Sequence, residues 1–312
     1  MCRILNFGSM NLDYVYQVDH FVKPGETLSA ASQTVNAGGK GLNQSCALAR
    51  AGATVFHAGC FGTGGEPLLE ILRDAGVDTS FVLRTGEFQG NAIIQVEPSG
   101  ENCILLFGGS NQCITEGQIA SALAAFGKDD WLVLQNEING LPQIVDKASE
   151  RGMTIVLNPS PYNSKLGEVD FGKISWLLVN EVETEQITGT ADPDTAWERI
   201  HEKYPDLSLL ITLGDQGSVA FQEKNDNVET ARLPAENVKA LDTTAAGDTY
   251  TGYFVAALTE QRPLAECMRL ATMAAAISVT RAGAAPSIPR RQEVKAALAE
   301  KGNLFEGRAE HE

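Results

Sequence analysis

Two acidic residues enclose a run of small residues in DTTAAGDT, residues 242–249, and the apolar pattern of a helix follows at once. The small side chains at 245–247 leave consecutive backbone N–H groups uncovered at the start of this predicted helix. Such a nest of N–H groups binds anions and stabilises negative charge that develops during a reaction. Asp248 stands in the same turn, where a carboxylate can accept a proton from a hydroxyl that attacks a phosphoryl group. The alternative is that Asp242 or Asp248 only caps the helix.

A second segment rich in glycine, NAGGKGLNQS at residues 36–45, also leads into a predicted helix. Its glycines allow positive φ angles and let the backbone approach a ligand closely. Lys40 supplies a cation, and the side chain of Asn43 supplies two donors and an acceptor. The free N–H groups of the helix start would point at the same ligand. The segment is not a Walker A loop because Lys40 is followed by glycine, and an ordinary glycine-rich turn is the alternative.

Composition and short motifs exclude several classes of protein. The formal net charge is −16, so nucleic acid and anionic membrane surfaces would be repelled. The six cysteines form no CxxC pair and the four histidines form no HxxxH or HExxH motif, which argues against zinc sites and dithiol redox chemistry. GxSxG and GxGxxG are missing, which argues against an α/β-hydrolase and a Rossmann oxidoreductase. The N-terminal residues do not resemble a signal peptide and no stretch is long enough to span a bilayer, so we expect a cytoplasmic protein.

Short apolar runs alternate with amphipathic segments along most of the chain. Buried strands are predicted at 2–8, 55–60, 131–135, 153–158, 175–180 and 208–214. Helices are predicted at 41–52, 66–76, 141–152, 194–204, 247–259, 263–281 and 291–301. Because strand and helix alternate, we expect an α/β fold with a central, mostly parallel sheet and helices on both faces.

Two segments interrupt this alternation, at 13–35 and 89–107. Both alternate polar and apolar residues in short pieces, and both contain turn signals, PGE and PSGE. We predict extra strands outside the parallel sheet that form a small β flap, with ordinary surface hairpins as the alternative.

Polar residues or a glycine turn follow five of the predicted strands. In chain order these are Asn11 and Asp13, Asn136 and Glu137, Asn158, Asn180 and Glu183, and Gly214. Ligands of open α/β sheets bind outside the carboxyl ends of the strands. The sequence therefore predicts a ligand site along this edge.

AGGKGLNQS at 37–45 and DTTAAGDT resemble the two signature segments of the ribokinase-like sugar kinases, the phosphofructokinase-B type. Further similar pieces follow the family's order, namely GSMNLD, PGET, NEVE, TLGDQG and SVTRAGAAPS, so the resemblance covers nearly the whole chain. It implies one sugar kinase domain over residues 1–312, an α/β core with a β lid at about 13–35 and 89–114. Such a lid pairs with the lid of a second subunit, so a homodimer is expected.

The resemblance also implies a reaction. ATP would donate its γ-phosphate to a primary sugar hydroxyl, with O5 of D-ribose as the first expectation. The alternatives are deoxyribose, a fructose-type furanose, an adenosine-like nucleoside, or a sensor of sugar or nucleotide without catalysis. Asp248 would be the catalytic base, and the N–H groups of Ala245, Ala246 and Gly247 would form the anion hole. The sugar would contact Asn11, Asp13, Gly39, Lys40, Asn43, Glu137 and Asp248.

Nucleotide and metal sites follow from the same resemblance. ATP would bind at Asn180, Thr212, Gly214, Gly217, Gly247 and Thr272, and Mg²⁺ would be associated with Glu183. A monovalent cation, K⁺, would activate the enzyme from loops that contain Asp242, Thr244, Ser278, Arg281, Gly283 and Ser287. The chain departs from the family pattern at the short loop 60–67, which bears on the choice of sugar. It also departs at Thr272, where the family often has His or Asn near the adenine.

Overall fold

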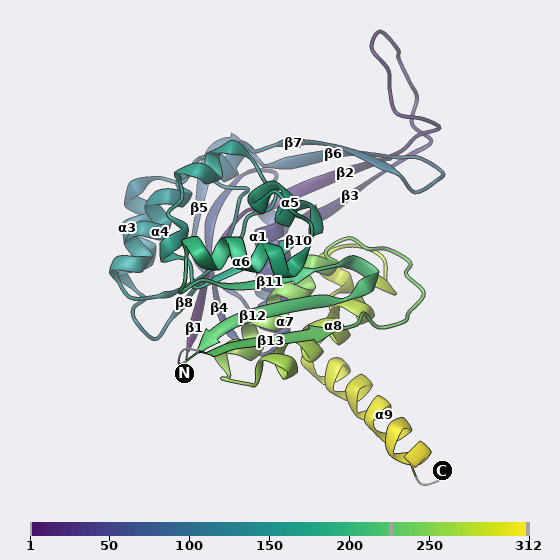
Figure 1. Cartoon of the computed structure of the whole chain (residues 1–312). Helices are drawn as coiled ribbons and strands as arrows, with labels where there is room; N and C mark the ends of the chain where they lie inside the picture. Colours follow the sequence, from purple (N-terminus) through teal and green to yellow (C-terminus); the bar gives the residue numbers. More distant parts are fainter. Residues whose placement is uncertain (1, 225–226, 310–312) are drawn as a thin grey trace.

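The computed structural model describes residues 2–224 and 227–309, within which nine strands form a central sheet (Figure 1). In spatial order the strands are β13 (Asn227–Leu233), β12 (Ser218–Lys224), β11 (Ser208–Thr212), β10 (Trp176–Asn180), β9 (Thr154–Asn158), β8 (Trp131–Gln135), β1 (Arg3–Phe7), β4 (Thr54–Thr63) and β5 (Asp78–Phe88). All neighbours from β11 to β5 pair in parallel, whereas β12 and β13 form an antiparallel hairpin at one edge. The expected central, mostly parallel sheet is therefore confirmed.

Helices cover both faces of this sheet because its strands are apolar on both sides. Along β10, Trp176 and Leu178 pack into one core and Leu177 and Val179 into the other. The first core is closed by α1 (Lys40–Arg50), α2 (Glu66–Asp74), α7 (Ala246–Thr259), α8 (Leu264–Val279) and the start of α9 (Arg291–Ala309). The second is closed by α3 (Glu116–Ala124), α4 (Leu141–Glu150) and α6 (Pro193–Lys203). Across the residues that the structure describes, every helix is too short or too polar to cross a bilayer.

All six predicted strands and all seven predicted helices occur, and several elements were not predicted. The missed elements are β5, β12, β13, α3 and α5 (Glu181–Thr188). Strand β5 is largely exposed towards its end, so it lacks the continuous apolar run that marks its neighbours. Helix α5 begins at Glu181, directly after the last residue of β10, and this leaves no turn signal between the two elements.

A second sheet of four strands forms the predicted flap. Its spatial order is β3 (Ser32–Gly38), β2 (Asn11–Gln17), β6 (Asn91–Val96) and β7 (Asn102–Phe107), and it projects away from the central sheet (Figure 1). Strands β2 and β6 pair in parallel, and the two outer pairs are antiparallel. The first flap strand begins at Asn11, two residues before the predicted start of the lid at residue 13. The last flap strand ends at Phe107 and not at the predicted residue 114, because Gly109–Gln112 form a 3₁₀ turn and Ile114 joins the core.

The order of the strands reverses between β1 and β8. From β1 the chain continues to β4 and β5 on one side, and it returns through the flap to β8 on the other. The loops after β1 and β8 therefore diverge to opposite faces of the sheet. Such a switch point is where open α/β sheets bind their ligands.

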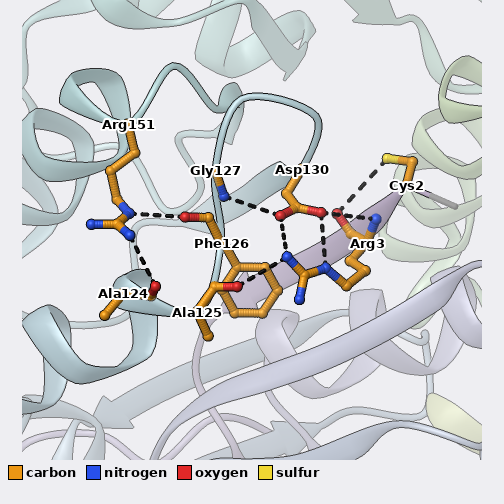
Figure 2. Close-up of polar contacts among 8 residues, drawn as sticks. All are labelled: Cys2, Arg3, Ala124, Ala125, Phe126, Gly127, Asp130 and Arg151. Atoms are coloured by element: carbon orange, nitrogen blue, oxygen red, sulfur yellow. Dashed lines mark hydrogen bonds and ion pairs between the residues drawn. The ribbon is translucent and has the colours of Figure 1, made fainter.

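The opposite end of β1 is fixed by an ion pair between Arg3 and Asp130 (Figure 2). Arg3 Nε donates to Asp130 Oδ1 at 3.0 Å, Gly127 N donates to Asp130 Oδ2 at 3.0 Å, and the guanidinium lies 4.8 Å from the centre of the Phe126 ring. Burial alone would raise the pKa of Asp130, but the hydrogen bonds from Arg3 and Gly127 outweigh it and lower that pKa. These contacts hold the first strand against the turn that follows α3, away from the ligand edge.

Candidate active site

Asp248 lies in the first turn of α7 and is 7% exposed. Asn43 Nδ2 donates to its Oδ2 at 3.0 Å, and Gln44 Nε2 donates to its Oδ1 at 2.9 Å. Both amides come from the first turns of α1, so the starts of two helices converge on one carboxylate. Asp248 also lines a cavity, which leaves the carboxylate open to a ligand on one side.

The convergence depends on a glycine between the two helices. A Cβ on Gly252 would lie 2.3 Å from the Cβ of Ala47 and 2.8 Å from the backbone nitrogen of Leu48. Gly252 stands about one turn after Asp248, and Asn43 about one turn before Ala47. Because α1 and α7 touch at this point, their N-terminal turns lie within hydrogen-bonding distance of each other.

The N–H groups at the start of α7 form only part of the predicted nest. Ala245 takes a left-handed conformation, with φ of 60°, which turns the chain into the helix. Within the described residues, the N–H groups of Ala245 and Gly247 have no protein acceptor, whereas the N–H of Ala246 donates to the carbonyl of Thr243 at 3.2 Å. Open N–H donors therefore stand at the positive end of α7, beside the carboxylate of Asp248.

A polar cavity of about 270 Å³ adjoins these N–H groups. Of the residues predicted for the site, it brings together Lys40, Asn180, Glu183, Thr212, Ala245, Ala246, Gly247 and Asp248. Burial alone would lower the pKa of Lys40, but the charges of Asp248, Glu137 and Glu183 outweigh it and raise that pKa. The cavity is therefore lined by the positively charged side chain of Lys40 and by the N-terminal end of α7, and both attract an anion.

A second cavity, of about 370 Å³ and mainly apolar, continues from the first. The two share Thr212, Thr243, Ala246 and Gly247. Its lining includes the predicted residues Gly214, Gly217 and Thr272, together with Tyr250 and Val279 from α7 and α8. Thr272 is buried on the wall of this cavity. A polar cavity joined to an apolar one at the α7 start suits a ligand with an anionic chain and a flat apolar group.

Asp13 and Glu137 lie beyond the ends of β1 and β8, near Asp248. A Cβ on Gly38 would lie 1.9 Å from Asp13 Oδ2, so the glycine in β3 leaves room for this carboxylate. Burial, and then the charges of Glu137 and Asp248, raise the pKa of Asp13 to about 7. Burial also raises the pKa of Glu137, against the opposing charge of Lys40. Carboxylates are thus crowded in one space where few solvent contacts offset their repulsion.

Backbone donors and an amide fix the orientation of the groups around this space. Glu137 Oε2 accepts from the N–H of Lys40 at 3.0 Å. Asn111 Oδ1 accepts from the N–H of Met10 at 3.0 Å, and Asn111 Nδ2 donates to Asn11 Oδ1 at 2.7 Å. The Nδ2 group of Asn11 is therefore the part of that side chain left to donate to a ligand. Gly39 packs directly against this strand, because a Cβ there would lie 2.9 Å from the backbone nitrogen of Asn11.

Sequence reasoning missed Asn111 and Gln44. Asn111 follows the flap strand β7, in a segment that carries no recognisable pattern. Gln44 stands next to the predicted Asn43, and only the packing of α1 against α7 brings its amide to Asp248. Its place within the glycine-rich segment 36–45, next to Asn43, was the signal that the sequence offered for Gln44.

Glu183, predicted to associate with Mg²⁺, also caps a helix. Its Oε2 accepts from the N–H of Asn180 at 3.1 Å, and Asn180 Oδ1 accepts from the N–H of Glu183 at 2.8 Å. Within the described residues, no cluster of three or more His, Cys, Asp or Glu side chains could hold a metal ion. Mg²⁺ commonly binds one or two carboxylates together with substrate phosphates and water. Glu183, on the wall of the polar cavity, fits that mode and not a cage made of protein alone.

Asp242 joins the two loops predicted to hold a monovalent cation. Its Oδ1 accepts from the N–H of Thr244 at 2.9 Å, and its Oδ2 accepts from the N–H of Gly283 at 2.8 Å. Burial alone would raise the pKa of Asp242, but these hydrogen bonds outweigh it and lower that pKa. The carboxylate therefore ties residues 242–244 to the turn after α8.

The side chains of the other residues predicted for the cation point elsewhere. The buried hydroxyls of Ser278 and Ser287 each donate to a carbonyl three residues earlier, at 2.8 Å. The guanidinium of Arg281 pairs with Glu293 at the start of α9. Any contact of these three residues with a cation would accordingly use their backbone carbonyls, as the family resemblance implies.

A sequence model described as pfkB family carbohydrate kinase matches residues 1–291. The chain is 37% identical to a ribokinase of Haemophilus influenzae over 296 residues, which covers 92% of this chain and 95% of that protein. A crystal structure of ribokinase from Thermotoga maritima matches with a TM-score of 0.85 at 34% identity and covers 96% of this chain and 100% of that one. A structure of Arabidopsis thaliana ribokinase complexed with ribose and ATP matches with a TM-score of 0.84 at 27% identity and covers 96% and 99%.

Replacing Asp13 with Asn should stabilise the unliganded protein at pH 8 and should have no effect near pH 4. The pKa of Asp13 is about 7 in the folded chain, against about 3.9 in an unfolded chain. The protonated Asp13 adds to the free energy of unfolding. This contribution is fully present below the pKa of Asp13 in the unfolded chain, and it is lost as pH rises through its pKa in the folded chain. We expect urea unfolding to show a gain of about 1–2 kcal/mol at pH 8.

The matched control is Asn in place of the exposed Asp19, which should change stability little at either pH. A loss of stability in the Asp13→Asn variant at pH 8 would contradict the argument that crowded carboxylates strain this site.

Proposed function

This chain belongs to the pfkB family of carbohydrate kinases, and from that premise we propose that it is a ribokinase. It is an ATP-dependent sugar kinase, and the proposed reaction converts D-ribose and ATP to D-ribose 5-phosphate and ADP. The observation that carries the proposal is the buried carboxylate of Asp248 beside open N–H groups, where a polar and an apolar cavity meet. We also infer a cytoplasmic enzyme, because all six cysteines are free thiols, as in a reducing compartment.

We assign Asp248 the role of general base. The sugar hydroxyl oxygen forms a bond to the γ-phosphorus of ATP, and its proton passes to the carboxylate. The bond from the γ-phosphorus to the bridging oxygen breaks, and its electron pair leaves with ADP. The transition state of such a transfer is loose, so a weak base serves if the proton moves late. Hydrogen bonds from Asn43 and Gln44 keep the carboxylate in one place while this happens.

The start of α7 is proposed as the anion hole. The open N–H groups of Ala245 and Gly247 would donate to oxygens of the transferred phosphoryl group, and the helix dipole would add to their effect. The N–H of Ala246 would join them by exchanging the carbonyl of Thr243 for a phosphate oxygen. Lys40, on the wall of the same cavity, would offset the remaining negative charge.

The crowded carboxylates are proposed to bind the sugar. Ionised Asp13 and Glu137 accept hydrogen bonds, and the hydroxyls of a sugar supply donors that relieve the repulsion between them. Asn11 would donate to a sugar oxygen through its free Nδ2 group. Gly39, Lys40 and Asn43 complete the set of residues proposed for this subsite, which ends at Asp248.

We propose that the nucleotide occupies the other side of the α7 start. Its adenine would lie in the apolar cavity beside Thr272, Gly214 and Gly217, and its phosphates would pass Thr212 and Asn180 towards Gly247. Mg²⁺ would be held by the phosphates, by water and by Glu183. When bound, it neutralises charge on the phosphates.

A bound K⁺ is proposed as an activator behind the anion hole. Backbone carbonyls in the loops around Asp242, Thr244 and 278–287 would hold it, and the carboxylate of Asp242 already joins these loops. A cation there would order residues 245–247 without touching the reacting atoms. The ion would then raise turnover without taking part in the chemistry.

The flap is proposed to form the interface of a homodimer. Val35, Tyr14, Ile93 and Leu105 lie in register across its four strands and form one row on the face opposite Asp13. Val35 is 52% exposed, Ile93 41% and Leu105 67%, and an apolar row of this kind is typical of a buried interface.

Replacing Leu105 with Glu should therefore convert a dimer into monomers in analytical ultracentrifugation. The matched control is Glu in place of Val228, an exposed valine on the edge strand of the other sheet, which should leave the dimer intact. A wild-type protein that sediments as a monomer at micromolar concentration would refute the proposed interface.

Replacing Asp248 with Asn should greatly slow phosphorylation while ribose still binds. Asparagine keeps the shape of the side chain and cannot accept the proton, so we expect kcat to fall by about 10²–10⁴-fold.

ADP release should be measured with Mg²⁺ on ribose, deoxyribose, fructose and adenosine, in K⁺ buffer and in buffer free of K⁺. Calorimetry measures ribose binding by the variant, and Asn in place of the exposed Asp74 is the control.

Strong ribose turnover that falls without K⁺ is the expected result for the wild-type protein. Turnover on a different sugar would keep the mechanism and change the substrate. Binding without turnover on any of them would favour a sensor, and full activity in the Asp248→Asn variant would refute the assigned base.

A further inference from the structure

Gln44 is a fully buried side chain that contacts Asp248, and its own hydrogen-bond partners show how that contact is oriented. Its Nε2 group donates to Asp248 Oδ1 at 2.9 Å and to Asn158 Oδ1 at 3.1 Å. Its Oε1 accepts from Gln135 Nε2 at 2.6 Å. An amide has one donor end and one acceptor end, so its neighbours determine which end faces the carboxylate.

The orientation of Gln44 is fixed from a backbone carbonyl on one side. Asn6 Nδ2 donates to the carbonyl of Gly41 at 2.7 Å, and a carbonyl can only accept. Asn6 Oδ1 must then face Gln135, whose Nε2 group donates to it at 2.9 Å. The same Nε2 group donates to Gln44 Oε1, which leaves the Nε2 group of Gln44 towards Asp248.

A second backbone carbonyl, that of Leu178, fixes the orientation of the Gln44 amide from the other side. Asn158 Nδ2 donates to the carbonyl of Leu178 at 2.8 Å, so Asn158 Oδ1 faces Gln44 as an acceptor. A reversed Gln44 amide would place its oxygen against the oxygens of both Asp248 and Asn158. Two backbone carbonyls thus independently fix the same direction for this chain of hydrogen-bonded amides, and each of its side chains is buried or half-buried.

We propose that Gln44 is a positioning residue that holds the Asp248 carboxylate in its reactive orientation, and that Gln135 and Asn6 in turn orient Gln44. The χ2 torsion of an aspartate is soft, so without such a donor the carboxylate rotates freely about its last bond. Asn43 holds Oδ2, and Gln44 holds Oδ1. The effect on rate rests on the proposed kinase function, whereas the effect on geometry does not.

This chain of hydrogen-bonded amides conducts no proton, because none of its side chains titrates. A proton taken up by Asp248 therefore returns to the cavity and not to the interior. The buried end of the chain reaches Ser45, which accepts from Asn6 Nδ2 at 2.7 Å and lies 2.8 Å from His57 Nδ1. Burial lowers the pKa of His57 to about 4, so this end carries no charge near neutral pH.

The test compares methionine at three buried glutamines. Gln44→Met removes the donor, Gln135→Met removes the group that orients it, and Gln118→Met makes the same change at a buried glutamine under the other face of the sheet. We expect kcat to fall by about 10–100-fold for Gln44→Met, by analogy with the loss of other supporting contacts at active sites. Gln135→Met should show a smaller loss, and Gln118→Met should retain wild-type kcat. Ribose affinity should stay within about threefold in all three, because none of them is proposed to touch the sugar.

Crystal structures of the Gln44→Met and wild-type proteins provide the second readout. The Asp248 carboxylate should be rotated about χ2 or disordered in the variant. A wild-type kcat for Gln44→Met, an equal loss in Gln118→Met, or an unmoved carboxylate would overturn the inference. If the wild-type protein phosphorylates no sugar, the proposed function fails, and the two crystal structures still decide whether Gln44 positions Asp248.

Discussion

Helix α7 crosses α1 at Gly252, where the absence of a side chain lets the two helices touch. That contact places the starts of both helices side by side, and the surroundings of Asp248 depend on it. From α1 come the amides that hold Asp248, and from α7 come the carboxylate and the open N–H groups. Each helix also directs its positive end to the same point, so an anion is attracted there by two dipoles. The two glycine-rich signatures of the sequence are thus parts of one structure.

The same site is costly for the unliganded protein. Asp13, Glu137 and Asp248 are brought together with Lys40 where burial limits solvation, and the pKa of Asp13 rises to about 7 as a consequence. Sites that serve function commonly store such strain and lose it when their ligand binds. A polyol, which offers donors and carries no charge, relieves this strain better than an anion would. The phosphate chain belongs on the other side of Asp248, where the N–H groups and Lys40 lie.

The sequence predicts the parts of this structure that rest on local chemistry. Continuous apolar runs such as WLVLQ and SWLLVN identify strands that are buried on both faces, and small residues before Asp248 identify an exposed helix start. Other features depend on tertiary contacts and escape such reasoning. Strand β5 has an exposed end without a repeating pattern, and the nest at 245–247 loses one donor to the carbonyl of Thr243. The roles of Gln44 and Asn111 follow from the packing of α1 on α7 and from the return of the chain from the flap.

The position of the phosphate on the product tests the central claim most directly. Uniformly ¹³C-labelled D-ribose and Mg·ATP should be incubated with the protein in K⁺ buffer, and the product followed by ³¹P and ¹³C NMR. The account predicts a new phosphomonoester signal whose phosphorus couples to C5 and to C4 of the pentose, together with an equal amount of ADP. ADP without a sugar phosphate, a phosphate that couples to C1, or no reaction in the presence of bound ribose would contradict it.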